Sequence, residues 1–159
     1  MYARDMARIA TPVGTITVTG CEAHVEAITI DAADLPGVEG STGAVRIAAE
    51  QLRQWFAGHR TGFDLPLLPA GTLRGQALRD AMCAIRYAEV LSYGELARQA
   101  GSSARAIGQA CARNPYPIVV PCHRVTNADG SLGAYSAGAG SRTKAWLLDF
   151  EARGRRVLL

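Results

Sequence analysis

The sequence lacks any long apolar segment. Its 159 residues contain no run of about 18 consecutive apolar side chains, the length that a membrane-spanning helix needs. The first ten residues, MYARDMARIA, carry an acid early and have no apolar core of the kind that a secretory signal requires. We therefore expect a cytoplasmic protein, and the 48% hydrophobic and 19% charged content is ordinary for a soluble globular chain.

A paired-cysteine motif is also missing. The four cysteines, at positions 21, 83, 111 and 122, form no C-x-x-C pair, so neither a zinc ribbon nor a redox dithiol is indicated. In a reducing compartment the default for each is a small buried hydrophobic side chain, and we expect this for Cys83. Cys122 differs from the others because a histidine follows it directly.

The charge is unevenly distributed between the two halves of the chain. Residues 1–70 hold five arginines and eight acids, a net of −3, whereas residues 71–159 hold eleven arginines, one lysine and six acids, a net of +6. An anionic partner, with nucleic acid first, is therefore expected for the second half.

The first half predicts a small α/β domain. Residues 7–30 favour a β-hairpin, with apolar runs at 14–18 and 25–30, and residues 45–56 have a helical apolar period. Residues 63–68 favour an edge strand, since Pro66 would disrupt a central one. The segment Pro69-Ala-Gly-Thr forms a linker. We therefore expect an N-terminal domain at 1–70 and a C-terminal domain at 71–159.

Short helices are expected in the second half, at residues 76–86, 93–100, 104–113 and 146–151, the last ending near Gly154. Ser92 and Glu95 form a capping-box pattern, and Ser103 can cap the helix that follows. Helix, glycine-containing turn and helix over 93–113 is typical of a helix-turn-helix. The small side chains of 104–112 suit a close approach to a partner surface or to another helix, and the pattern alone favours neither.

The stretch PIVVPCHRV, residues 117–125, carries the chemistry. A thiol with a pKa of about 8.5 needs help to become a thiolate, and His123 is the adjacent base. Neighbouring side chains of an extended segment point to opposite faces, so we expect a bridging water between Cys122 and His123. Glu151 is the candidate acid to orient the imidazole. On spacing alone, a buried thiol beside a surface histidine is the simpler interpretation.

These residues resemble the active-site signature of the O6-alkylguanine-DNA alkyltransferases. The resemblance covers nearly the whole chain and rests on motifs in the family's order and spacing. They are QLRQWFAG at 51–58, FDLPL at 63–67, SYGELA at 92–97, RAIG at 105–108, NP at 114–115, PCHRV at 121–125, LGAYS at 132–136 and KAWLLDFE at 144–151.

The resemblance implies a two-domain α+β fold, with a small RNase H-like α/β N-terminal domain and a mostly helical C-terminal domain containing a helix-turn-helix. It implies direct-reversal DNA repair, in which the alkyl group of O6-alkylguanine in duplex DNA passes to Cys122 and each molecule acts once. The nucleotide must be flipped out of the duplex first. The second helix of the motif is expected in the minor groove, the free protein is expected as a monomer, and no cofactor is implied.

The roles follow position by position from the same resemblance. Cys122 is the nucleophile, His123 the water-mediated base and Glu151 its orienting acid, while Tyr93 donates towards the guanine and helps to rotate the 3′ phosphate. The residues expected to form the substrate pocket are Val125, Tyr135, Ser136, Asn114 and Cys111, with the backbone carbonyls of Cys122 and Val125 reading the guanine 2-amino group. Those expected to contact DNA are Arg105, which enters the base stack, and Ala104, Ala106, Gly108 and Tyr93.

Two segments depart from the family pattern. The turn between Gly101 and Arg105 is shorter than usual, and the loop from Tyr135 to Lys144 is longer. Some relatives bind a structural zinc in the N-terminal domain, but Cys21, His24 and His59 do not complete a four-ligand set, so we expect no metal.

Three other functions remain to be weighed. A non-catalytic lesion-binding relative would lack the cysteine, which is present at position 122. A transcriptional regulator switched by alkylation would need an added sensor domain. An unrelated cysteine hydrolase would need oxyanion donors and would turn over many times.

Overall fold

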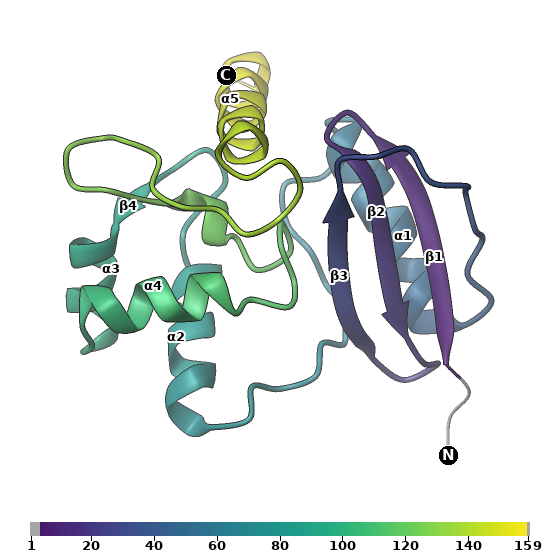
Figure 1. The fold of residues 1–159 in the computed structure, drawn as a ribbon, viewed down its shortest axis with the longest axis horizontal. Coiled ribbons are helices and arrows are strands. Elements are labelled where there is room, and N and C mark those ends of the chain that lie inside the picture. The colour runs from purple at the N-terminus through teal and green to yellow at the C-terminus, as the bar shows by residue number, and fades with distance from the viewer. Residues whose placement is uncertain (1–3, 159) are drawn as a thin grey trace. The chain divides into compact units, whose positions relative to one another are not determined.

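The computed structural model describes residues 4–158 and shows an α+β protein (Figure 1). The chain divides into two compact units. The first comprises the residues up to Leu68 together with Ala137–Ala139, and the second comprises Pro69–Ser136 together with the residues from Gly140 onward. None of the helices within 4–158 is both long enough and apolar enough to cross a membrane.

The first unit is built on an antiparallel sheet of β1 (Asp5–Thr11), β2 (Gly14–Gly20) and β3 (Val25–Asp31), in that spatial order. The predicted hairpin is confirmed as β2–β3, and β1 is an additional strand. Helix α1 (Gly43–Phe56) lies along one face of the sheet, as Figure 1 shows, and confirms the predicted helix. The side chains buried in this unit alternate along the strands and follow the helical period: Ile9, Ile16, Val18, Val25, Ile28, Val45, Ala48, Leu52 and Trp55.

The predicted edge strand at 63–68 is wrong. Only Leu67 forms a bridge, a single parallel pairing with Val25, and the Val25 N–H donates to the Pro66 carbonyl at 2.9 Å. Pro66 has no N–H of its own, so a ladder cannot continue through it. The segment therefore follows β3 without becoming a strand.

The second unit contains four helices and a two-stranded parallel pairing among the described residues. They are α2 (Leu73–Cys83), β4 (Leu91–Ser92), α3 (Tyr93–Ala100), α4 (Ala104–Ala112), the 3₁₀ turn η1 (Cys122–Arg124), β5 (Val125–Thr126) and α5 (Ser141–Leu158). Helix α2 begins earlier than the predicted Gln76, because the Thr72 side chain accepts the Gly75 N–H and caps it.

The two short helices α3 and α4 follow their local capping signals. Ser92 accepts the Glu95 N–H while the Glu95 carboxylate accepts the Ser92 N–H, which confirms the capping box. Gly101 ends α3 with φ 64°, and Ser103 accepts the Ala106 N–H to begin α4. The boundaries of the two helices and the tight turn between them are thus determined by residues within this segment.

Helix α5 is much longer than predicted. It begins at Ser141 and passes through Gly154 instead of ending there. A Cβ at position 154 would lie 2.6 Å from the Tyr87 hydroxyl, so the glycine makes room for that ring and is no terminator. The buried side chains of α5 fall at helical spacing and include Lys144, Leu147 and Glu151. One face of the helix therefore carries both of its buried charges.

The tight β1–β2 turn generates the first prediction. Gly14 has φ 112°, and a Cβ there would lie 2.1 Å from the Asp31 carbonyl oxygen. We expect Gly14→Ala to lower the free energy of unfolding by about 2 kcal/mol or more, measured by urea denaturation. Gly62→Ala is the matched control, because a Cβ at position 62 meets nothing within 4 Å. Equal stability of the two variants would contradict this account of the turn.

Candidate active site

The backbone around Cys122 is tightly turned. Pro121 has φ −81° and ψ 60°, and the Cys122 N–H donates to the Val120 carbonyl at 2.8 Å, which is an inverse γ-turn. The 3₁₀ turn η1 follows at once. The expectation of an extended segment here is therefore wrong, and its cause is the proline, whose fixed φ suits the turn. Cys122 is 5% exposed.

Asn114 links the end of α4 to the thiol. Its Nδ2 donates to Cys122 Sγ at 3.2 Å and to the Val120 carbonyl at 2.9 Å, and its Oδ1 accepts the Tyr116 N–H. One side chain thus fixes both the turn before the cysteine and the environment of the sulfur. A donor aimed at the sulfur favours the thiolate over the thiol.

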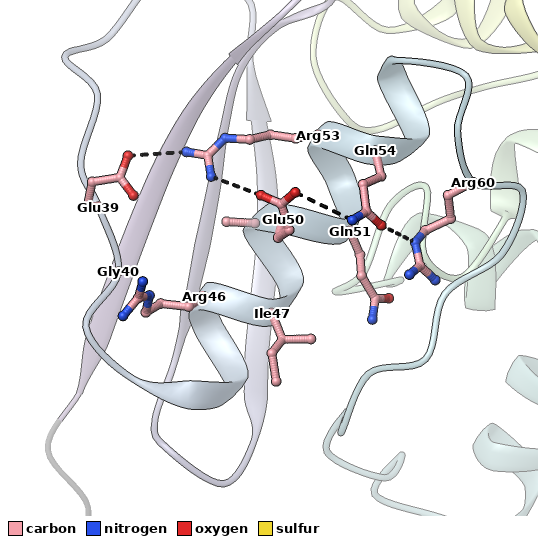
Figure 2. A pocket seen from close by; sticks show the side chains of 10 residues that line it. Glu39, Gly40, Arg46, Ile47, Glu50, Gln51, Arg53, Gln54 and Arg60 are labelled. Atoms are coloured by element: carbon pink, nitrogen blue, oxygen red, sulfur yellow. Dashed lines mark hydrogen bonds and ion pairs between the residues drawn. The ribbon is translucent and has the colours of Figure 1, made fainter.

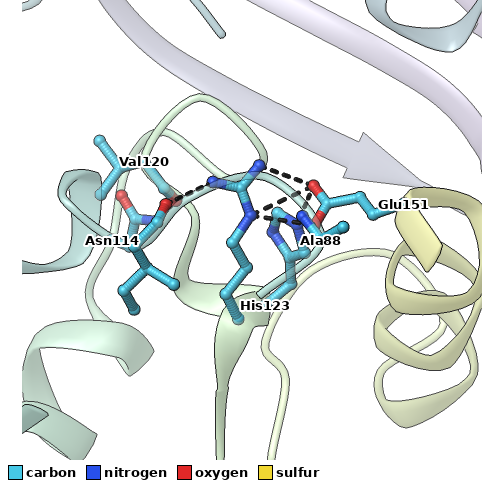
Figure 3. Close-up of polar contacts among 7 residues, drawn as sticks. Ala88, Asn114, Val120, His123 and Glu151 are labelled. Atoms are coloured by element: carbon cyan, nitrogen blue, oxygen red, sulfur yellow. Dashed lines mark hydrogen bonds and ion pairs between the residues drawn. The ribbon is translucent and has the colours of Figure 1, made fainter. Parts of the chain in front are cut away.

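His123 is oriented by Glu151, as the sequence predicted. The imidazole Nε2 lies 2.9 Å from Glu151 Oε2, and neither side chain is exposed. Figure 3 shows the two groups facing each other from η1 and α5. The interpretation of His123 as a surface histidine is wrong. Because an ionised carboxylate only accepts, Nε2 carries the proton, and Nδ1 is left as a buried acceptor without a partner among the described residues.

Burial keeps both reactive groups neutral. It raises the pKa of the Cys122 thiol, although the Asn114 hydrogen bond and the Lys144 charge lower it in part. It also lowers the pKa of His123, against the opposing effect of Glu151. The resting pair is therefore a thiol and a neutral imidazole, which has a free lone pair to accept a proton.

The Glu151 carboxylate accepts from three directions. Besides His123, it accepts from Arg124 Nε at 2.9 Å, from Arg124 Nη2 at 2.7 Å and from the Ala88 N–H at 3.3 Å. Burial raises its pKa, but the hydrogen bonds from His123 and Arg124 outweigh that effect and bring the pKa to about 2. Glu151 is therefore ionised throughout the neutral range.

Lys144 is a buried cation that the sequence analysis did not single out. Its Nζ donates to the carbonyls of Val125, at 2.6 Å, and Leu132, and lies 5.8 Å from the centre of the Tyr93 ring. Burial lowers its pKa, and the thiols of Cys111 and Cys122 raise it. This ammonium joins β5 to the loop that follows it. The sequence pattern around a buried lysine does not differ from the pattern around a solvent-exposed one, so the burial of Lys144 could not be predicted.

Tyr93 stands at the start of α3, which the parallel β4–β5 pairing places beside Val125. A Cβ at Gly133, where φ is 75°, would lie 3.0 Å from the Tyr93 hydroxyl, so only glycine lets the loop approach this closely. Burial raises the pKa of Tyr93, and Cys111 and Cys122 raise it further. Burial likewise raises the pKa of Cys111 to about 12.

The remaining predicted residues lie in the loop that precedes α5 and on helix α4. The Tyr135 hydroxyl is buried without a partner among the described residues, and burial raises its pKa well above the usual value, whereas Ser136 is exposed. The α4 residues predicted to contact DNA lie partly or fully in solvent: Ala104, Arg105, Ala106 and Gly108. The expected burial of Cys83 is wrong, since this residue is exposed at the last position of α2.

The described residues of the first unit contain no set of reactive side chains comparable with the one around Cys122. Cys21 is buried, His24 is half-buried and His59 is exposed, and no metal-binding group of three His, Cys, Asp or Glu gathers among the described side chains. A cavity of about 430 Å³ lies along α1. Figure 2 shows its wall, where Arg53 lies between Glu39 and Glu50. This cavity holds neither a cysteine nor a histidine.

Comparison with known proteins agrees with this geometry. The family described as "6-O-methylguanine DNA methyltransferase, DNA binding domain" matches residues 75–153. A methylated-DNA–protein-cysteine methyltransferase of Mycolicibacterium paratuberculosis is 38% identical over 151 residues, which cover 91% of this chain and 90% of that protein. The chain belongs to the O6-alkylguanine-DNA alkyltransferase family.

Other family members match over a shorter range or in three dimensions. The protein of the same name from Mycobacterium leprae is 45% identical over 111 residues, 69% of this chain and 66% of that protein, so the alignment spans just under two thirds of it. A crystal structure of Mycobacterium tuberculosis OGT in complex with DNA superposes with a TM-score of 0.81 at 35% identity, covering 94% of this chain and 93% of that one.

The Glu151 carboxylate generates the second prediction. Its pKa is about 2 in the folded protein against 4.5 for the free group, so its contribution to stability is present above pH 4.5 and is lost as the pH falls towards about 2. We expect the gap in unfolding free energy between wild type and Glu151→Gln to shrink by about 3 kcal/mol over that range. Urea denaturation at a series of pH values measures it.

The control lies on the same helix. Asp149 is exposed and pairs with Arg153 one turn away, and an exposed pair contributes little to stability, so Asp149→Asn should follow the wild type at every pH. A gap between wild type and Glu151→Gln that stays constant through the acid range would contradict the assigned ionisation.

Proposed function

We propose that this protein repairs DNA by direct reversal, transferring the alkyl group of an O6-alkylguanine to Cys122 in a single turnover. The observation that carries the proposal is the pair of hydrogen bonds on either side of the Cys122–His123 peptide. The half-buried Asn114 donates to the buried Cys122 sulfur at 3.2 Å, and the buried His123 lies 2.9 Å from the Glu151 carboxylate. Membership of the alkyltransferase family supports it.

The proton path follows from the tautomer of His123. Because Nε2 donates to Glu151, Nδ1 is the atom that accepts the Cys122 proton, through a bridging water. Sulfur then attacks the alkyl carbon, the S–C bond forms and the C–O6 bond breaks. Tyr93 donates its phenolic proton to the departing guanine anion, and the proton taken up by His123 then restores the phenol, so that the net products are S-alkylcysteine and neutral guanine. The imidazolium formed in this step is stabilised by the Glu151 carboxylate beside it.

Recognition of the flipped base would use the backbone beside the thiol. The carbonyls of Cys122 and Val125 each accept one bond already, from the Val125 N–H and from Lys144, and each oxygen has a second lone pair for the guanine 2-amino group. Tyr135, with its unpartnered buried hydroxyl, and Ser136 close over the base. Cys111 forms the opposite wall.

DNA would be bound through α3 and α4 acting as a helix-turn-helix, with α4 in the minor groove. The net charge of +6 in residues 71–159 and the exposed Arg105 support this. Ala104, Ala106 and Gly108 allow α4 to approach the backbone closely, and Arg105 fills the stack behind the flipped base. The proposal includes an RNase H-like N-terminal domain at 1–70, a C-terminal domain at 71–159 and a monomeric free protein.

The third prediction tests the reaction. Incubation with a duplex that carries one O6-methylguanine should add one methylene unit to the intact mass of the wild type, in a one-to-one ratio with DNA. Cys122→Ala should gain nothing, because no other thiol has the base beside it. Intact-mass spectrometry and peptide mapping measure both results.

The exposed cysteine gives the matched control for this test. Cys83→Ala should be methylated like the wild type, since its thiol has no catalytic partner. Lesion binding without mass change would instead identify a non-catalytic reader of damage. Demethylation of many lesions per protein molecule would point to a hydrolase.

The fourth prediction separates base flipping from chemistry. Arg105→Ala should slow methyl transfer from duplex DNA by about 10- to 100-fold, since holding a base out of the stack costs a few kcal/mol. Transfer from free O6-benzylguanine, which needs no flipping, should be unaffected. Single-turnover rates on the two substrates measure the contrast.

Arg113, at the C-terminal end of α4, carries the same charge and supplies the control. Arg113→Ala should affect the duplex reaction far less than Arg105→Ala does. An equal loss on the free base and on the duplex would exclude the flipping role of Arg105.

A further inference from the structure

Arg124 is buried beside the catalytic residues, yet the proposed chemistry gives it no task. It is 6% exposed, at the end of η1, and each of its three guanidinium nitrogens donates a hydrogen bond. Nε and Nη2 donate to Glu151, Nη1 donates to the Ile85 carbonyl at 2.8 Å, and the group lies 5.7 Å from the centre of the Tyr87 ring. A planar fork of donors suits a carboxylate in a way that a lysine cannot reproduce.

Arg124 and His123 meet on the same carboxylate oxygen. Glu151 Oε2 accepts from Arg124 Nη2 at 2.7 Å and lies 2.9 Å from His123 Nε2. The negative charge that faces the imidazole is therefore already balanced by a permanent cation. Protonating His123 at rest would place two cations on one buried carboxylate, with Lys144 as a third positive group nearby.

A carboxylate alone would have the opposite effect on the histidine. An unbalanced neighbouring anion raises an imidazole pKa, and a histidine charged at rest cannot accept the thiol proton. The charged groups that act on His123 are Glu151 and Lys144 from α5 and Arg124 from η1. The other titratable groups nearby are the thiol of Cys122 and the hydroxyls of Tyr87 and Tyr135, which interact with the Glu151 charge. Burial, Arg124 and Lys144 lower its pKa, and Glu151 raises it.

We propose that Arg124 is a positioning residue for alkyl transfer: it holds the Glu151 carboxylate and offsets its charge, so that Glu151 orients His123 without converting it to an imidazolium. This inference rests on the proposed function. Arg124 is the permanent cation beside Glu151, whereas His123 becomes a cation only when it accepts the thiol proton.

The test is the pH dependence of single-turnover methyl transfer, compared for wild type, Arg124→Met and Arg124→Lys. Methionine keeps much of the length and removes the charge. We expect the acid limb of its pH–rate profile to move to higher pH, because the rate follows the neutral fraction of His123. A one-unit rise in the His123 pKa lowers the rate up to about tenfold on that limb, and the rate recovers to the wild-type value at higher pH. Lysine keeps the charge and loses the fork, so its pH profile should follow the wild type at a lower overall rate.

A second measurement reads the imidazole directly. In an NMR titration of the wild type, His123 should remain neutral to a pH below the ordinary histidine pKa of about 6.5. In Arg124→Met the His123 titration should move upward. Where Arg124→Met does not fold, the wild-type titration and the Arg124→Lys profile still decide.

The outcomes separate the two proposals. A rate lowered by the same factor at every pH in Arg124→Met, with an unmoved His123 titration, would show a structural role only and overturn the inference. Protonation of wild-type His123 at a pH above the ordinary histidine pKa of about 6.5, or a shifted profile in Arg124→Lys, would overturn it as well. Absence of methyl transfer by the wild type at any pH would refute the proposed function instead.

Discussion

The second unit depends on one buried carboxylate. Glu151 is fully buried on α5, and it accepts from an imidazole, a guanidinium and a backbone N–H that come from different segments. Burial of an unpaired carboxylate is very unfavourable, so the charge is tolerated only because these donors are in place. Removing any one donor leaves the buried carboxylate with fewer hydrogen bonds to stabilise its charge. The geometry of the histidine is therefore fixed by the same interactions that keep the helix docked.

A second constraint couples the thiol to the helix proposed to bind DNA. Asn114 follows α4 directly and donates to the Cys122 sulfur. Ile118, with φ 74°, and the γ-turn at Pro121 hold the intervening segment in a conformation that extended chain would not give. A displacement of α4 on DNA would reach the sulfur through a single side chain. The reactive residue and α4 are thus linked by the Asn114 side chain and by the turned segment between them.

Local signals in the sequence predicted the parts of the fold that local interactions determine. Helix α3 and the start of α4 follow from Ser92, Glu95 and Ser103, whose side chains bond within their own segments. The length of α5 was not predictable, because Gly154 is tolerated only through the position of Tyr87. The exposure of Cys83 was missed for a similar reason, since residue type gives only the average burial.

The contacts of the active site could likewise be predicted from the sequence only in part. His123 and Glu151 were predicted to meet because the chemistry of a nucleophile requires a base and an orienting acid. Arg124 and Lys144 were not, because nothing in the sequence distinguishes a buried cation from a surface one; only the tertiary structure shows which carboxylate or carbonyls it contacts.

The buried thiol suits the proposed role of Cys122 as an alkyl acceptor that acts once. A cysteine with a lowered pKa is a thiolate at rest and reacts with oxidants and stray electrophiles, which would consume the protein. Here burial raises the pKa of Cys122 and keeps the neighbouring His123 neutral, so neither of these two side chains is charged until a proton moves between them. The separation of charge then takes place next to Glu151, which is already ionised and held by Arg124. In the proposed reaction, the thiol would therefore become reactive only when an alkyl donor occupies the site.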